Sequence, residues 1–185
     1  EVRVYSKRTR DVVSPLWLRE SSDREPTATV LGQTAHVSTD DALEALAAAR
    51  QAWAQGAGHW PTLRVEERIE AVEHFTAAMV AVRDRVCRLL MWEVGKTWAD
   101  AQGEFDRTVQ YIRDTIETLK TQDRDNSRLQ FREGIIAQVR RAPLGVTLCM
   151  GPFNYPLNET FATLIPALIM GNTAVVKLPR FGVLL

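Results

Sequence analysis

Apolar and polar positions follow a helical spacing through the middle of the chain. Between residues 38 and 120, apolar residues recur at steps of three and four, with polar residues between them. The two clearest stripes are Val65, Ile69, Val72, Phe75 and Met79, and then Phe105, Val109, Ile112, Ile116 and Leu119. The pattern predicts a largely helical region whose apolar stripes need a partner surface.

The expected helix ends are marked by capping and turn residues. Ser38 precedes Asp41 by three positions, which predicts a capping box at the start of the first helix. The glycine-rich run at 55–58 should end that helix, and Thr62 is the expected cap of the next one. Residues 121–127 are all polar and are expected to form a connector after the last helix.

A period of two replaces the helical spacing in two places. Residues 25–32 are typical of a short strand that enters a turn. Residues 128–141 alternate between apolar and polar side chains, with Glu133-Gly134 as a hairpin turn or a bulge. A long strand with one polar face indicates an edge that seeks a partner strand.

The last forty residues predict a strand, a helix and a second strand. Val146–Met150 is a short continuous apolar run, as in a parallel strand buried on both faces. A helix is expected to open at Asn158 or Glu159, and Gly171-Asn172 supplies a left-handed stop. Residues 173–176 are expected to form the second buried strand. The fold class is therefore α/β, with a helical region followed by the first βαβ unit of a Rossmann-like parallel sheet.

Composition and charge exclude several classes of function. The 185 residues have a formal net charge of zero, 45% apolar and 25% charged residues, so nothing indicates nucleic acid or a membrane surface as a partner. No secretory leader is visible, and Cys87 and Cys149 are expected to be reduced thiols of a cytoplasmic protein. His36, His59 and His74 show no metal-binding spacing, so no metal is expected.

Candidate chemistry is concentrated in the loop Gly151-Pro152-Phe153-Asn154-Tyr155. It follows the carboxyl end of a predicted parallel strand, where open α/β sheets bind ligands. Prolines on both sides of Asn154 restrict the backbone. A fixed amide there could stabilise a developing oxyanion, an effect of roughly 3–4 kcal/mol on a barrier. The alternative is an ordinary turn that contains asparagine. Cys149 lies inside the apolar strand and is not expected to be a nucleophile.

Four motifs occur in one order along this segment. They are P-x-G-V at 143–146, P-F-N-Y-P at 152–156, P-A-L-x-x-G-N at 166–172, and Lys177 at the end of a strand. Together they resemble the aldehyde dehydrogenase superfamily, most closely its NADP-dependent non-phosphorylating glyceraldehyde-3-phosphate dehydrogenases. The resemblance implies an aldehyde dehydrogenase-like fold. Residues 1–125 would be the helical part of the cofactor-binding domain, 126–142 the oligomerisation strands, and 143–185 an incomplete nucleotide-binding sheet.

The resemblance also implies roles for individual residues. Asn154 would stabilise the oxyanion, while Gly151, Pro152 and Phe153 would line the cofactor site. Lys177 would contact hydroxyls of the adenine ribose, although a solvated lysine at a strand end is the alternative.

Arg180 stands where the family usually has a glutamate that binds the 2′-hydroxyl. A guanidinium there suits a 2′-phosphate and favours NADP, with NAD possible. An exposed arginine facing solvent is the alternative.

A second constellation concerns the substrate. The stretch Glu104-Phe105-Asp106-Arg107-Thr108 resembles the E-V-x-R-T motif of the same glyceraldehyde-3-phosphate dehydrogenases. The resemblance implies that Arg107 and Tyr155 hold a substrate phosphate. An arginine that only lies along the helix surface is the alternative.

The implied activity is the oxidation of glyceraldehyde 3-phosphate to 3-phosphoglycerate with NADP. The family's nucleophilic cysteine and its glutamate base have no counterpart here, so the chain is expected to be part of a longer, homo-oligomeric enzyme. Two alternatives stay open. One is an NAD(P)-dependent dehydrogenase for another small aldehyde, such as a semialdehyde. The other is a non-catalytic fragment that acts as an interaction module.

Overall fold

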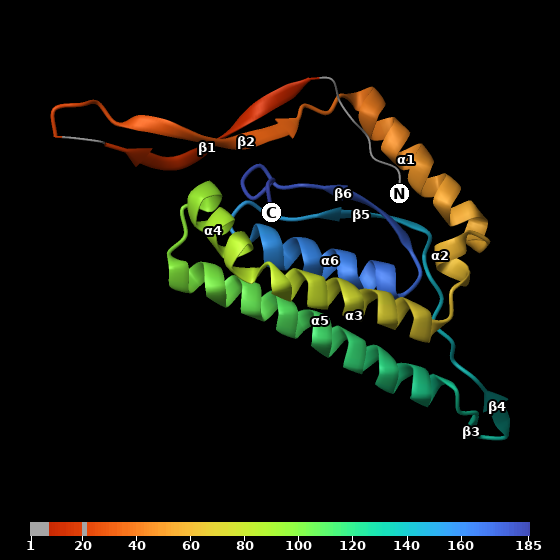
Figure 1. Ribbon diagram of the computed structural model, residues 1–185. Helices are drawn as coiled ribbons and strands as arrows, with labels where there is room; N and C mark the ends of the chain where they lie inside the picture. Colours follow the sequence, from red (N-terminus) through yellow and green to blue (C-terminus); the bar gives the residue numbers. More distant parts are fainter. Residues whose placement is uncertain (1–7, 20–21) are drawn as a thin grey trace.

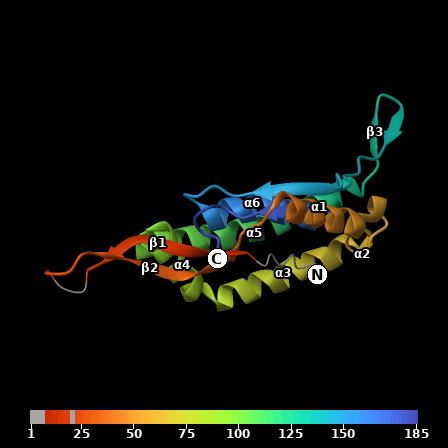
Figure 2. The same cartoon turned by 90° about the horizontal axis from the view of Figure 1, so that it is seen from above.

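The computed structural model of the chain describes residues 8–19 and 22–185. An N-terminal hairpin leads into a run of helices, and a small hairpin then leads into a βαβ unit (Figure 1). Both hairpins extend away from the body of the molecule (Figure 2). No helix in these ranges is long and apolar enough to cross a bilayer.

The N-terminal hairpin pairs β1 (Thr9–Leu18) with β2 (Thr27–Ala35) in antiparallel register. β2 contains most of the strand predicted at 25–32, whereas the mixed pattern of the first residues gave no sign of β1. The Ser14 hydroxyl donates a 2.5 Å hydrogen bond to the Trp92 carbonyl and so links β1 to the helix that contains Trp92.

The helical region contains α1 (Thr39–Trp53), the short α2 (His59–Thr62), α3 (Val65–Ala81), α4 (Arg83–Val94) and α5 (Trp98–Asn126), with a 3₁₀ turn at Ala54–Gly56. The capping box at Ser38 and Asp41 is confirmed, because each residue's side chain accepts the other's backbone N–H. The helical prediction for residues 38–120 is therefore confirmed in outline.

Two expected helix boundaries are wrong. Thr62 ends α2, and its hydroxyl donates a hydrogen bond to the Gly58 carbonyl. α3 begins at Val65, and Glu67 in its first turn accepts the Arg64 N–H at 2.8 Å. Residues 121–126 belong to α5, so they are not a connector. These residues include no glycine or proline, and a polar run can continue a helix whose last turns are solvated.

β5 (Val146–Met150), α6 (Pro156–Ile169) and β6 (Thr173–Lys177) form the predicted βαβ unit. The two strands are parallel, with Val146 opposite Thr173 and Met150 opposite Lys177. α6 begins at Pro156, earlier than predicted, because proline suits the first turn of a helix. Gly171 has φ +91°, which confirms the left-handed stop after α6.

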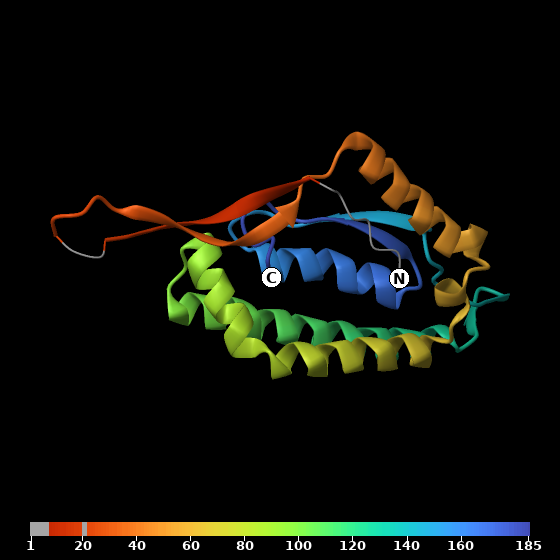
Figure 3. The same ribbon diagram turned by 45° about the horizontal axis from the view of Figure 1, so that its top comes forward.

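The main core lies between α6 and the helices α3, α4 and α5. Figure 3 shows α6 between the two strands on one side and α3 and α5 on the other. The most deeply buried apolar side chains of this core are Cys87, Leu90, Ala101, Phe105, Ile112 and Ile169. The predicted stripes of α3 and α5 therefore found their partner surface in α6.

One prediction about β5 is wrong for the described residues. Cys149 is buried, but Leu148 and Met150 are 62% and 56% exposed. Alternate residues of a strand point to opposite faces, so the face of β5 that carries Leu148 and Met150 is largely open here.

Asn172 ties the turn after α6 to the start of β5. Its side-chain oxygen accepts the N–H groups of Leu144 and Gly145 at 2.6 and 2.9 Å, and its amide donates to the Ala167 carbonyl. These bonds explain why G-N follows P-A-L at this spacing, since one buried side chain fixes the relative position of strand and helix.

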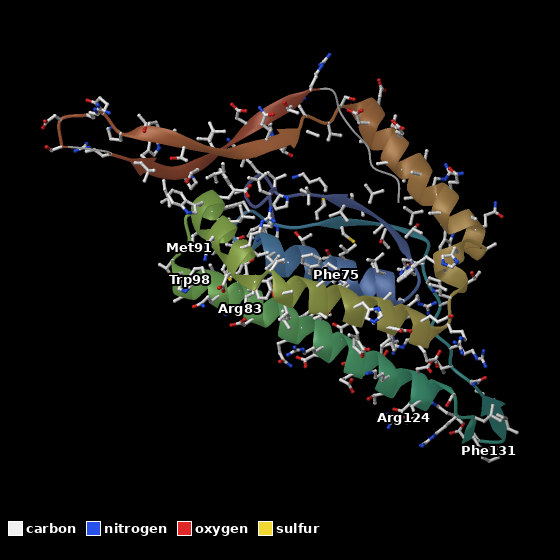
Figure 4. The ribbon with its side chains drawn as sticks, in the orientation of Figure 1. Phe75, Arg83, Met91, Trp98, Arg124 and Phe131 are labelled. Carbon is white, nitrogen blue, oxygen red and sulfur yellow. The ribbon has the colours of Figure 1, made fainter. Side chains whose placement is uncertain are left out.

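The second hairpin consists of β3 (Gln130–Arg132) and β4 (Ile135–Ala137). Glu133 and Gly134 both have positive φ, so they form a hairpin turn of the kind that favours Asn-Gly or Asp-Gly, and the bulge is excluded. Phe131 is 72% exposed, and Ile135 and Ile136 are each 67% exposed. Figure 4 shows Phe131 at the far end of the hairpin, away from the body.

Candidate functional site

The carboxyl ends of β5 and β6 lie side by side because Met150 pairs with Lys177. The loop 151–155 leaves β5 at this edge, and the segment with Arg180 leaves β6 at the same edge. The structure therefore brings the predicted oxyanion loop and the predicted cofactor cations to one end of the sheet, where ligands of open α/β sheets bind.

Gly151 allows the loop to pass directly over α6. A Cβ atom on Gly151 would lie 2.0 Å from the Thr160 hydroxyl oxygen and 3.2 Å from the Thr160 backbone nitrogen. The Thr160 hydroxyl is buried and has no hydrogen-bond partner in the described structure. Only glycine fits this crossing, which brings the loop backbone against the helix.

Asn154 is exposed, and with Phe153 and Phe181 it lines a hollow that Pro15 and Val94 complete. Phe153 is 62% exposed, and its ring lies edge-on to that of Phe181, with centres 6.4 Å apart. The amide of Asn154 is therefore accessible at the mouth of the sheet. Such accessibility is what a donor to a substrate oxygen needs.

Lys177 and Arg180 are both exposed at this edge. Within the described part of the chain, neither forms an ion pair, and the Arg180 guanidinium lies 5.3 Å from the Phe181 ring centre. Two cations without a protein counter-charge leave positive potential where an anionic ligand could bind.

Arg107 and Tyr155 are brought together, although they are far apart in the sequence. The Arg107 guanidinium carbon lies 5.8 Å from the centre of the Tyr155 ring, within cation–π range. Arg107 is exposed and has no ion-pair partner among the described residues. Its neighbour Asp106 is engaged by Arg83 through bonds of 2.8 and 2.7 Å, which hold the pKa of Asp106 below its ordinary value.

Sequence reasoning missed Lys96 as a member of this group and gave Glu104 no role of its own. The Lys96 ammonium lies 3.8 Å from the Tyr155 ring centre and 2.5 Å from a Glu104 carboxylate oxygen. The other Glu104 oxygen accepts the N–H groups of Leu157 and Asn158. The sequence does contain one signal for Glu104. It is an acidic residue beside Phe105, next to the stripe that faces the core, and a buried acid needs a partner.

The two cysteines do not take part in this arrangement. Cys149 and Cys87 are 2% and 0% exposed. Burial raises the pKa of the Cys87 thiol, which keeps it protonated and unreactive. No group of three or more metal-ligating side chains occurs in residues 8–19 and 22–185.

Comparison with known protein families matches residues 19–184 to the aldehyde dehydrogenase family. The N-succinylglutamate 5-semialdehyde dehydrogenase of Burkholderia cenocepacia strain HI2424 is 31% identical over 157 residues, which are 84% of this chain and 31% of that protein. Its namesake from Burkholderia mallei strain SAVP1 is 29% identical over 169 residues, or 91% of this chain and 33% of that protein.

Solved structures show the same fold. Betaine aldehyde dehydrogenase from Staphylococcus aureus in complex with NAD⁺ has a TM-score of 0.76 at 24% identity and covers 94% of this chain and 32% of its own. An NAD-dependent benzaldehyde dehydrogenase from Corynebacterium glutamicum has a TM-score of 0.71 at 24% identity, with coverage of 97% and 36%. The chain spans about a third of the length of the curated relatives it matches. By sequence and by fold, the chain belongs to the aldehyde dehydrogenase family.

Proposed function

We propose that this chain forms the oxyanion- and cofactor-binding part of an NAD(P)-dependent enzyme that oxidises an aldehyde to a carboxylic acid. The observation that carries the proposal is the pairing of Met150 with Lys177, which places the Asn154 loop and the exposed cations at one edge of the sheet. The family match and the aldehyde dehydrogenases named above support the same class of reaction.

Asn154 is proposed to act on the substrate oxygen. A thiolate that attacks an aldehyde forms a carbon–sulfur bond and leaves negative charge on the carbonyl oxygen. The amide N–H of Asn154 can donate to that oxygen from its exposed position. Both cysteines of this chain are buried, so the attacking thiolate is proposed to come from another part of the enzyme.

The residues at this edge fit a nicotinamide dinucleotide, which would supply the hydride acceptor of the reaction. Gly151 has no side chain and lets the backbone cross close to α6, and Lys177, at the end of β6, is proposed to bind ribose hydroxyls. The exposed guanidinium of Arg180 favours a 2′-phosphate and therefore NADP. NAD is the alternative, and it is the cofactor named for both solved relatives described above.

For the substrate we favour an aldehyde with an anionic group, with glyceraldehyde 3-phosphate as the first candidate. Arg107, exposed and directed at the Tyr155 ring, is the observation that supports an anion. A semialdehyde is the second candidate, because its carboxylate would suit the same guanidinium. The curated relatives are named for such a substrate.

The assembly and location of the enzyme are part of the same proposal. The exposed apolar side chains of the β3–β4 hairpin support pairing with another subunit in a homo-oligomer. The buried thiols of Cys87 and Cys149 form no disulfide, which supports a cytoplasmic location for the enzyme.

The test is an assay of an enzyme that contains this chain within a family-length polypeptide. Glyceraldehyde 3-phosphate, a semialdehyde and a neutral aldehyde of similar size are each offered with NADP⁺ or NAD⁺, in the absence of inorganic phosphate. We expect reduced cofactor and carboxylic acid to form in equal amounts. If no aldehyde is oxidised with either cofactor, the interaction-module alternative replaces this proposal.

A further inference from the structure

We infer that Glu104 is a positioning residue that fixes the Asn154 loop through the first turn of α6, an inference that rests on the proposed function of Asn154. Glu104 lies on α5 and is 1% exposed, so it touches neither solvent nor a substrate directly. Its effect would pass through the backbone that follows Asn154.

One oxygen of Glu104 caps α6 from a different helix. Oε1 accepts the N–H of Leu157 at 2.9 Å and the N–H of Asn158 at 3.1 Å. These amides belong to the first turn of α6, where N–H groups lack partners within the helix and where negative charge is stabilising. The residue at the N-cap position is Tyr155, whose side chain makes no capping bond. Glu104 therefore supplies the cap that the local sequence lacks.

The other oxygen of Glu104 is neutralised by Lys96. The Lys96 ammonium lies 2.5 Å from Oε2, and the two side chains are 13% and 0% exposed. A buried carboxylate is costly unless it is paired and hydrogen-bonded, and Glu104 meets both conditions. Gly95, with φ +81°, ends α4 and turns the chain so that Lys96 reaches this position.

Lys96 also contacts Tyr155, the residue next to Asn154. Its ammonium lies 3.8 Å from the centre of the Tyr155 ring, so Tyr155 is held by its side chain. Asn154 thus stands between an anchored Tyr155 and the Gly151 crossing over Thr160. Fixed donors are more effective at an oxyanion than mobile ones, because they need not reorganise during the reaction.

The first test measures the loop itself in the family-length enzyme. Backbone-amide NMR relaxation of residues 153–155 and hydrogen exchange at Leu157 and Asn158 are compared between wild type and Glu104→Gln. We expect greater loop motion and faster exchange in the variant. Glu159→Gln is the matched control, because Glu159 is an exposed acid in the same first turn of α6. Unchanged loop motion in Glu104→Gln would overturn the inference.

The second test is a double-mutant cycle in the family-length enzyme. Glu104→Gln should lower kcat by about 10- to 100-fold, as small misplacements of catalytic groups do, with little change in KM for the aldehyde. In an Asn154→Ala background the same substitution should cost almost nothing, because its effect passes through Asn154. A merely structural role predicts the same loss in both backgrounds, and that result would refute the inference.

If Glu104→Gln does not fold, Glu104→Asp retains the charge for Lys96 and withdraws the carboxylate from α6, and the same outcomes apply. If the wild-type enzyme oxidises no aldehyde, the proposed function fails. The loop measurements in the same polypeptide still decide whether Glu104 fixes this segment, because they do not depend on turnover.

Discussion

The guanidinium of Arg107 and the ring of Tyr155 lie 5.8 Å apart, although one residue belongs to α5 and the other to the turn before α6. The packing of α5 on α6 creates this proximity, because the buried stripe of α5 faces α6 and leaves Arg107 at its margin. An exposed guanidinium beside the loop 151–155, the proposed oxyanion site, is the basis of the proposed preference for anionic aldehydes.

Replacement of Arg107 by leucine should therefore impair anionic substrates selectively. A hydrogen bond to a charged group contributes about 1.5–3 kcal/mol, so kcat/KM for glyceraldehyde 3-phosphate should fall roughly 10- to 100-fold. The value for unphosphorylated glyceraldehyde should change little. Arg113→Leu is the matched control, since Arg113 is another exposed arginine on α5. Equal losses on both substrates would show that Arg107 supports the fold instead.

Arg180 should govern the choice between the two cofactors. Arg180→Glu replaces a partner of the 2′-phosphate by a group that repels it, so the ratio of kcat/KM for NADP⁺ to that for NAD⁺ should fall by about a hundredfold or more. Arg141→Glu, which makes the same change of charge before the start of β5, should leave the ratio as it is. An unaltered ratio in Arg180→Glu would remove the reason for favouring NADP.

The crossing of Gly151 over Thr160 should be sensitive to one methyl group. Gly151→Ala places a Cβ 2.0 Å from the Thr160 hydroxyl oxygen, and overpacking of this kind typically costs about 1–3 kcal/mol. The measurement is the urea midpoint of the family-length enzyme. Thr160→Ala removes the clashing, unpartnered hydroxyl, so the double variant should recover much of the loss. Equal midpoints for wild type and Gly151→Ala would mean that the loop is not held against α6.

The sequence predicted those features that depend on neighbouring residues. Periodicity located the helices of residues 38–120, and the motif around Asn172 located the βαβ unit, because apolar spacing and turn residues act locally. The parallel register of β5 and β6 then accounts for the position of the three residues at one edge of the sheet, namely Asn154, Lys177 and Arg180.

The contacts of Glu104 could not be predicted in this way. Its bonds to the Leu157 and Asn158 N–H groups join residues more than fifty positions apart and depend on how α5 packs against α6. The polar end of α5 was predicted to be a connector, because a solvent-exposed helix end and an irregular connector have the same polar composition. β1 was missed because its apolar residues follow no regular alternation, and its register with β2 shifts twice.

The β3–β4 hairpin should carry subunit association. Ile135→Pro removes a backbone N–H from β4 and should disrupt strand pairing at this edge, so the sedimentation coefficient of the family-length enzyme should fall toward that of a smaller assembly. Ile135→Thr, which keeps the backbone donor and a β-branched side chain, should preserve more of the assembly. An intact assembly in the proline variant would show that the interface lies elsewhere.

The most direct test of the central claim is kcat for aldehyde oxidation by Asn154→Ala in the family-length enzyme. Loss of one oxyanion donor should lower kcat by about 10²- to 10³-fold, while the dissociation constant for the cofactor stays close to that of wild type. Asn154→Asp keeps the shape and places negative charge beside the oxyanion, so its loss should be at least as large. If Asn154→Ala turns over at the wild-type rate, Asn154 is not the oxyanion donor and the proposed role of this loop is wrong.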